Sequence, residues 1–141
     1  MKTNNKGFSL VELIVVIAIM AILAAVAIPT FASFITKANV AADVDMMNNV
    51  EYAAELALAA SGTDVTAVSV KLDNNKNADE ITVNDVVIIE TGAKDASASA
   101  EVKAWAKDIA DTIDWDYTFK SVEAGKTCSL NDDGKTLTVT D

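Results

Sequence analysis

An unbroken apolar run from Phe8 to Ile28 constrains this chain more than any other feature, and Glu12 is its only charge. As a helix this run is about 31 Å long, which matches a bilayer hydrocarbon core of about 30 Å. Its Ile, Leu, Val and Phe residues favour insertion by roughly 4 to 8 kcal/mol, and the carboxylate near one end opposes this by at most about 3 kcal/mol. The run therefore predicts a membrane-spanning helix. Lys2 and Lys6 place its N-terminus on the cytoplasmic side.

The junction between the basic leader and the apolar run carries a motif. Residues 6–13 read Lys-Gly-Phe-Ser-Leu-Val-Glu-Leu, and this pattern closely resembles the processing site of type IV pilins and of their secretion-system relatives, the pseudopilins. The resemblance is close over residues 1–34 and covers the rest only in broad layout. It implies that residues 1–7 are a leader, that a prepilin peptidase cuts between Gly7 and Phe8, and that the new amino group of Phe8 is methylated.

Two roles are open for Glu12. After cleavage Phe8 would carry a free amine one helical turn away from this carboxylate. Locally, a carboxylate near a helix N-terminus is stabilised by the exposed N–H groups and the helix dipole. The resemblance implies a second, intermolecular role, in which Glu12 of one subunit pairs with the Phe8 amine of a neighbour. Because a buried charge without its partner is costly, such a pair would fix the axial register of the subunits.

Pro29 is the only proline in the chain. It has no N–H to donate to the carbonyl of Ala25, and its ring crowds the preceding turn. We therefore expect a kink or a locally opened helix around residues 22–29 in lipid. The resemblance also implies that this backbone loosens in assembled filaments, although the chain lacks the upstream glycine that many relatives carry.

Two simpler interpretations compete with a pilin-type segment. The first is a secretory signal peptide, since Ala25-Val26-Ala27 offers a small-x-small cleavage site behind a basic leader. The apolar run is too long for an ordinary signal core, however, and Glu12 interrupts it. The second is a plain membrane anchor, which explains the length of the run but not the spacing of Gly7, Phe8 and Glu12.

The pattern beyond the membrane predicts that the helix continues. Residues 8–29 form its transmembrane or filament-core half, and residues 30–61 an amphipathic half that ends before Gly62. Apolar residues recur there at intervals of three and four, which indicates one buried face: Phe31, Phe34, Ile35, Ala38, Ala42, Met46, Val50, Ala53, Ala57 and Ala60. Lys37, Asp43, Asp45 and Glu55 fall mainly on the polar side of this pattern.

Residues 62–141 form a globular head with mixed signals. Strands are expected at 65–72 and around Trp115, Tyr117 and Phe119. A C-terminal hairpin is expected to pair 126–130 with 135–140 through a turn at Asn131–Gly134. A helix is expected at 96–113, and the stretch 81–90 is compatible with either a strand or a short helix. The predicted fold class is α+β, with a long N-terminal helix packed on a small antiparallel sheet. That layout is similar to the pilin fold.

Charge and composition exclude several classes of function. The net charge is −10, and losing Lys2 and Lys6 with the leader makes the mature chain −12. An acidic surface without a basic cluster argues against nucleic acid as a partner. The chain has no His and no Arg, so we expect no catalytic site, cofactor or metal, and Asn131–Gly134 reads as a turn rather than a calcium loop. Cys128 is alone, so the C-terminal disulfide of many pilins is absent, and we expect a buried thiol.

The resulting prediction is a structural subunit, not an enzyme, that polymerises into a type IV pilus. Its expected partners are identical subunits, the prepilin peptidase and methyltransferase, a membrane assembly platform, and lipid before assembly. It would be a single-pass membrane protein first and part of an extracellular filament afterwards, serving adhesion, twitching motility or biofilm formation. The alternatives are a major pseudopilin of a type II secretion system and a membrane-anchored binding domain that never polymerises.

Overall fold

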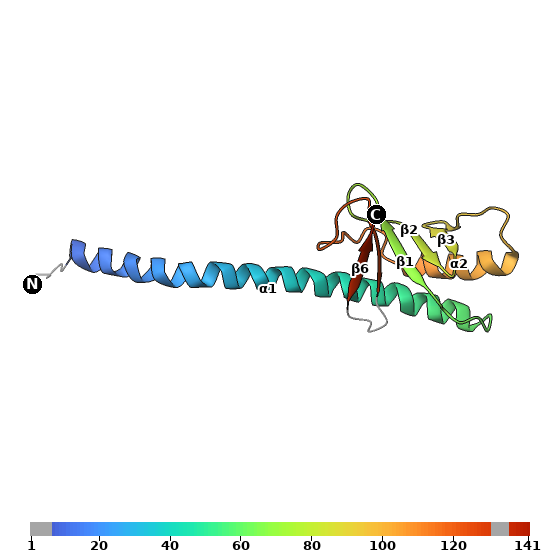
Figure 1. The fold of residues 1–141 in the computed structure, drawn as a ribbon, viewed down its shortest axis with the longest axis horizontal. Helices are drawn as coiled ribbons and strands as arrows, with labels where there is room; N and C mark the ends of the chain where they lie inside the picture. The colour runs from blue at the N-terminus through green and yellow to red at the C-terminus, as the bar shows by residue number, and fades with distance from the viewer. Residues whose placement is uncertain (1–6, 131–135) are drawn as a thin grey trace, which may run out of the picture. The chain divides into compact units, whose positions relative to one another are not determined.

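The computed structural model describes residues 7–130 and 136–141. Two compact units follow one another along the chain, the first ending at Lys37 and the second running from Ala38 to Asp141. Helix α1, Leu10–Ala59, contributes to both units (Figure 1). The predicted long helix from residue 8 to about residue 60 is therefore confirmed, with its start two residues later. Most of the expected leader, residues 1–7, lies outside the described residues.

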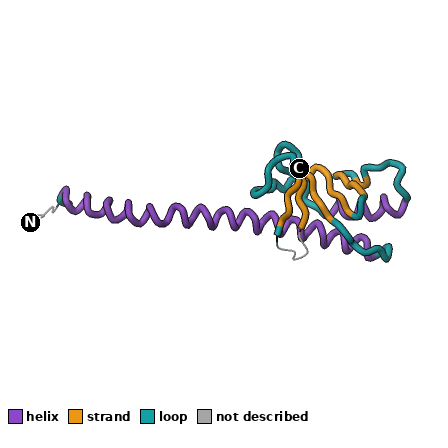
Figure 2. Tube along the Cα trace, viewed as in Figure 1, coloured by secondary structure: helices purple, strands orange, loops and turns teal. Residues whose placement is uncertain are grey.

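The second unit is built on one antiparallel sheet. Its strands are drawn in orange in Figure 2. Within the described residues the strand order is β4-β3-β2-β1-β5-β6. The strands are β1 Val68–Leu72, β2 Ala78–Val83, β3 Val86–Ile89, β4 Gly92–Ala93, β5 Thr127–Leu130 and β6 Leu137–Thr140. The predicted C-terminal hairpin is confirmed by the β5–β6 pairing, in which Cys128 lies opposite Val139. Its expected turn, Asn131–Gly134, falls outside the described residues.

A row of apolar side chains crosses four neighbouring strands on one face of the sheet. Cys128 pairs with Val70, Val70 pairs with Ile81, and Ile81 pairs with Ile88. All four are fully buried. Since side chains alternate between the two faces of a strand, this row defines the core face, and the opposite face carries residues such as Ser69 and Thr82. Cys128 is a free, buried thiol, as the sequence indicated.

Helices α1 and α2 supply the rest of the core. From α1 the buried face carries Met47, Val50 and Leu58, which join the same apolar cluster as the strand row. Helix α2, Ala100–Thr112, begins after the N-cap Ser99, whose Oγ accepts the N–H of Val102. Its buried side recurs at intervals of three and four residues and consists of Trp105, Ala106, Ile109 and Ala110. The head is thus a sheet with one face covered by helices, the predicted α+β, pilin-like fold.

The ambiguous stretch 81–90 is a hairpin, not a helix. Strands β2 and β3 are joined by Asn84 and Asp85, both with positive φ, of 47° and 65°. Two such residues make the tight turn whose twist matches antiparallel strands. The Asn84 Oδ1 also accepts the Thr66 N–H at 2.8 Å, so this side chain ties the segment just before β1 to the turn. The short-helix alternative is therefore wrong, and the predicted strand at 65–72 begins at Val68.

The predicted strand through Trp115, Tyr117 and Phe119 is also wrong. This segment forms turns, and its only sheet-like contact among the described residues is an isolated bridge between Thr118 and Asn77. The alternation of aromatic residues has another cause. Trp115 Nε1 donates to the Ala110 carbonyl at 2.9 Å, while the rings of Tyr117 and Phe119 meet edge to face with centroids 5.2 Å apart.

Candidate functional site

The segment Gly7–Ser9 precedes helix α1 and has no regular structure. All three residues are exposed, and Phe8 is 91% exposed. A Cβ placed on Gly7 would meet nothing within 4 Å. The peptide bond between Gly7 and Phe8 is therefore exposed and lies outside regular secondary structure, where a peptidase can reach it.

The first turn of α1 is closed by a reciprocal pair of hydrogen bonds. Ser9 N–H donates to Glu12 Oε2 at 2.8 Å, and Glu12 N–H donates to Ser9 Oγ at 3.2 Å. This is a capping box, in which the two side chains satisfy N–H groups that a helix leaves free at its start. The local role expected for Glu12 is therefore present in the single chain. The pairing with the Phe8 amine stays a prediction, because that amine exists only after cleavage.

Sequence reasoning missed the part that Ser9 plays. The signal was available, since Ser followed three residues later by Glu, just ahead of an apolar run, is the pattern of a capping box. The structure adds that the carboxylate already has a hydrogen-bond donor in the unassembled chain. Glu12 can therefore be carried without being left unsatisfied, which lowers the cost of holding it at the edge of the apolar segment.

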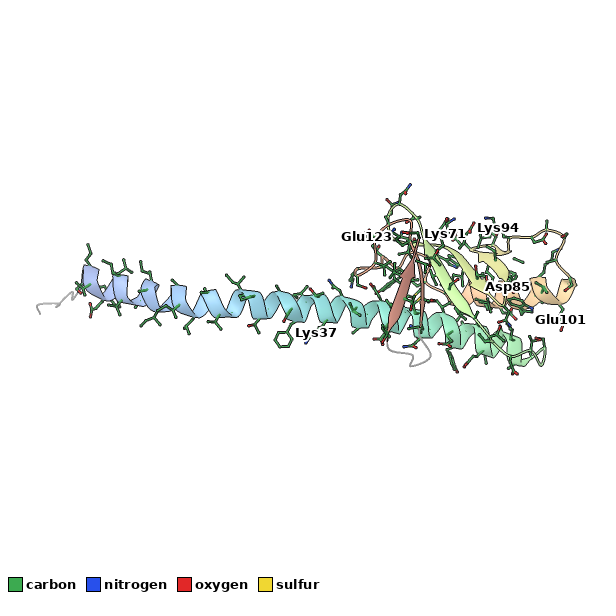
Figure 3. All side chains as sticks on the ribbon, viewed as in Figure 1. Lys37, Lys71, Asp85, Lys94, Glu101 and Glu123 are labelled. Carbon is green, nitrogen blue, oxygen red and sulfur yellow. The ribbon has the colours of Figure 1, made fainter. Side chains whose placement is uncertain are left out.

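The first unit presents apolar side chains on every side of α1 (Figure 3). From Leu10 to Ile35 every large hydrophobic residue is exposed, down to 48% for Ile35. Among the described residues α1 is the one helix long and apolar enough to cross a membrane, by length and composition. Contiguous apolar surface of this extent requires lipid or protein as its surroundings. It fits a membrane-anchored precursor.

Helix α1 runs through Pro29 without a break. Hydroxyl groups just beyond it are bonded to the helix itself, since Thr30 Oγ1 donates to the Val26 carbonyl at 3.0 Å and Thr36 Oγ1 to the Ala32 carbonyl at 3.1 Å. Such bonds let polar side chains lie in an apolar environment. The loosening expected around residues 22–29 is not seen in the single chain, and the kink remains a prediction for lipid and for the filament.

Among the described residues of the head, the fully buried charged side chain is Asp43. Its carboxylate accepts the Tyr117 hydroxyl at 2.9 Å, the Lys120 N–H at 3.0 Å, and both the N–H and the hydroxyl of Ser121, at 2.6 and 2.5 Å. The helical pattern placed Asp43 on the polar side, so its burial corrects that expectation. Charge-assisted bonds of this number hold the segment after α2 firmly against α1.

The Asp43 carboxylate also influences two neighbouring groups. Burial, together with the hydrogen bond to Asp43, raises the pKa of Tyr117 well above its ordinary value. Burial, with a smaller contribution from the Asp43 charge, raises the pKa of the Cys128 thiol to about 12. Both groups are therefore neutral at physiological pH. A neutral, buried thiol is a packing element rather than a nucleophile.

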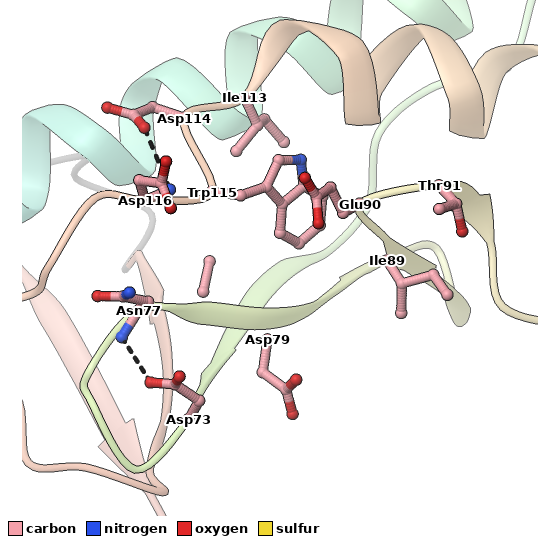
Figure 4. Close-up of a pocket in the computed structure, with 11 residues that line it drawn as sticks. Asp73, Asn77, Asp79, Ile89, Glu90, Thr91, Ile113, Asp114, Trp115 and Asp116 are labelled. Carbon is pink, nitrogen blue, oxygen red and sulfur yellow. Dashed lines mark hydrogen bonds between the residues drawn. The ribbon is translucent and has the colours of Figure 1, made fainter.

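A cavity of about 650 Å³ opens on the head beside the segment 113–116 (Figure 4). Its lining includes five carboxylates and one indole and no positive charge: Asp73, Asp79, Glu90, Asp114, Asp116 and Trp115. Turns already use two of these carboxylates, since Asp73 accepts the Asn77 N–H at 2.8 Å and Asp114 the Asp116 N–H at 3.2 Å. Across the described residues no three His, Cys, Asp or Glu side chains are placed to hold a metal ion.

Comparison with known proteins bears on the N-terminal segment. Neither the comparison with curated proteins nor that with solved structures found a match. A protein-family model, the prokaryotic N-terminal methylation motif, matches residues 2–28. These residues include the open bond at Gly7–Phe8, the capping box of Ser9 and Glu12, and most of the exposed apolar helix. Residues 2–28 thus carry the signature of type IV pilins and pseudopilins, at the head of a chain with a pilin-like α+β fold.

Proposed function

We propose that this chain is the structural subunit of a type IV pilus, which polymerises through its apolar helix after the leader is removed. The observation that carries the proposal is the methylation motif at residues 2–28, which stands at the start of a helix whose large apolar side chains are all exposed as far as Ile35. Lipid would cover this surface before assembly, and the same surface of other subunits would cover it afterwards. The acidic head would then face outward.

Processing would act on the exposed segment before α1. Prepilin peptidase would cut the Gly7–Phe8 bond, and methylation of Phe8 would follow. The products are a free leader and a mature chain whose first residue lies one turn before Glu12. A membrane assembly platform would then move the subunit from the bilayer into a helical filament. Contacts between unlike surfaces that do not close into a ring would extend the polymer.

Glu12 would have a different partner in each state. In the free subunit it accepts the Ser9 N–H at 2.8 Å. In the filament we expect it to pair with the Phe8 amine of a neighbour, where water is excluded. An unpaired carboxylate in that environment would cost several kcal/mol, so only the axial position that brings amine and carboxylate together would be populated. The pair would thus set the register more than the net stability.

Glu12→Gln and Ser9→Ala separate this role from simple helix capping. Glutamine still accepts the Ser9 N–H but carries no charge, whereas Ser9→Ala removes one side of the capping box, worth about 1 kcal/mol, and keeps the charge. We expect Glu12→Gln to remain in the membrane as a processed subunit without forming filaments, and Ser9→Ala to assemble. Filament yields can be measured by shearing cells and pelleting the released fibres. A normal yield from Glu12→Gln would contradict the proposal.

Electron microscopy of the cell surface tests the finer assignment. Long extracellular fibres that bind an antibody against the head support a pilus subunit. Fibres seen only on overproduction of the chain, together with loss of protein secretion on its deletion, would indicate the pseudopilin alternative. A chain that never enters a polymer and is indifferent to Glu12→Gln would instead be a membrane-anchored binding domain.

A further inference from the structure

A strip of exposed residues follows Pro29 on the first unit. Phe31, Phe34 and Lys37 are spaced three residues apart, so they share one side of α1. The two rings are 67% and 62% exposed, and Lys37 is exposed as well (Figure 3). Lys37 is also the only charged residue between Glu12 and Asp43 in the sequence. We call these three residues the stem strip.

A second strip lies on α1 within the head unit, on the side that does not join the core. Tyr52 is 66% exposed and Leu56 is 63% exposed, while Glu55 and Asp45 are exposed carboxylates. Tyr52 is three residues before Glu55 and four before Leu56, so these three lie together. The sequence from 38 to 70 contains several acidic residues and no lysine. We call Tyr52, Glu55 and Leu56 the head strip.

The two strips match each other in spacing and in charge. In each, an aromatic residue precedes a charged residue by three positions, and the charges are opposite. When two copies of α1 are laid parallel with one stagger of roughly five helical turns, Phe34 falls beside Tyr52 and Lys37 beside Glu55. One shift in register satisfies both pairs.

We propose that the stem strip of one copy docks on the head strip of a second copy, with Lys37 paired to Glu55 and Phe34 packed on Tyr52. The inference rests on the proposed polymer, and it names the partner of a surface that the single chain leaves in water. Aromatic packing adds to the attraction between the apolar helices, because the exposed rings remove apolar surface from water at this contact. The ion pair and the rings together supply specificity, because the staggers that place Lys37 beside Asp45 or Glu51 put Phe34 beside Ala42 or Asn48, where no second ring is available.

Charge reversal in the full-length chain tests this contact. Lys37→Glu and Glu55→Lys each place like charges at the interface, and we expect each to lower the yield of sheared filaments by at least about tenfold. The double variant restores an opposite pair and should recover most of the yield. Asp108→Lys makes the same charge change at an exposed position of α2 and serves as the matched control. Immunoblots of the membrane fraction check that every variant accumulates to the level of the parent.

Disulfide trapping gives an independent readout of the stagger. Filaments built from the chain carrying both Phe34→Cys and Tyr52→Cys should oxidise to a ladder of covalent multimers that reductant removes. Phe34→Cys combined with Asp45→Cys keeps the stem cysteine and moves the other one seven residues, or about 10 Å, which is too far for a disulfide. The native Cys128 does not compete, because its thiol is fully buried.

The outcomes separate this inference from the proposed function. Loss in both single variants, recovery in the double variant and a ladder only from the Phe34–Tyr52 pair support the contact. Filaments that form normally in the single variants, or a double variant that stays as defective as its parents, would overturn the contact and leave the polymer intact. A parent chain that forms no filaments at all would overturn the polymer, and the contact with it.

Discussion

Replacing Asp43 by alanine is expected to destabilise the head more than any other single change at a charged residue. The substitution removes the acceptor for the Tyr117 hydroxyl, the Lys120 N–H and both donors of Ser121. Asp43 is fully buried, so water does not replace the carboxylate without rearrangement of the segment that follows α2. Four donors that were satisfied at 2.5 to 3.0 Å would then lack partners.

The size of the effect follows from these contacts. A hydrogen bond to a charged acceptor contributes about 1.5 to 3 kcal/mol, but donors that share one acceptor do not add. Breaking a buried charged network by removing one partner costs about 3 to 5 kcal/mol. A domain of this size has a total stability of about 5 to 15 kcal/mol, so the variant would lose a large share of it. At about 4 to 8 °C per kcal/mol, a loss of about 3 to 5 kcal/mol lowers Tm by roughly 12 to 40 °C. Asp43→Asn keeps the volume and one oxygen, and we expect about half this loss.

Thermal unfolding in detergent micelles, followed by tryptophan fluorescence, measures the change on the head, because Trp105 and Trp115 both lie in the second unit. Asp45→Asn is the matched control, since Asp45 is exposed two residues along the same helix. We expect this control to unfold within a few degrees of the parent. An Asp43→Asn variant as stable as the parent, or a control that loses as much stability as Asp43→Asn, would refute the reasoning.

Three further predictions concern the head. Iodoacetamide at pH 8 should modify Cys128 only after unfolding, because burial raises the pKa of its thiol to about 12. Intact-mass spectrometry detects the adduct, and labelling of the folded chain would contradict the prediction. The hydrogen bond from Lys94 holds the pKa of Glu80 below its ordinary value, so Glu80 stabilises the fold above about pH 4 and this contribution fades as pH falls through the lowered value. Urea titrations should find Glu80→Gln less stable than the parent at pH 7, and the difference should shrink as the pH falls below about 4. A difference that does not shrink in acid would refute this account. Asn84→Ala should lower the free energy of unfolding by about 2 kcal/mol in the same titrations, because it removes the acceptor of the Thr66 N–H and puts alanine at a φ of 47°. The control Asp85→Asn should change stability little, because asparagine tolerates a positive φ. Equal losses from the two variants would argue against this account.

The long helix and the fold class could be predicted because their signals are local. Length and hydropathy from Phe8 to Ile28 suffice to predict a membrane-length helix, and spacings of three and four carry it to Ala59. The buried positions of Val70 and Cys128 agree with alternation within their predicted strands. The hairpin at 81–90 had a usable signal as well, since Asn84 and Asp85 between β-branched residues fit a two-residue turn.

The role of Asp43 had no local signal. On a helical pattern a carboxylate counts as polar, and its donors come from residues 117–121, far away in the sequence. The same contact explains the false strand at Trp115, Tyr117 and Phe119. Their alternation resembles a strand with one aromatic face. The hydrogen bonds of Tyr117 and Ser121 to Asp43 instead hold this segment against helix α1, where it does not pair as a strand. The alternation of aromatic residues is real, but tertiary contacts decide the backbone conformation of this segment.

The most direct test of the account is mass spectrometry of the N-terminal peptide from fibres sheared off native cells. The account predicts a chain that begins at N-methylated Phe8, recovered from material that pellets as filaments. A chain that begins at Ile28 would indicate ordinary secretion by a signal peptidase, and an intact Met1 confined to the membrane fraction would indicate a plain anchor; either result would contradict the proposed polymer subunit.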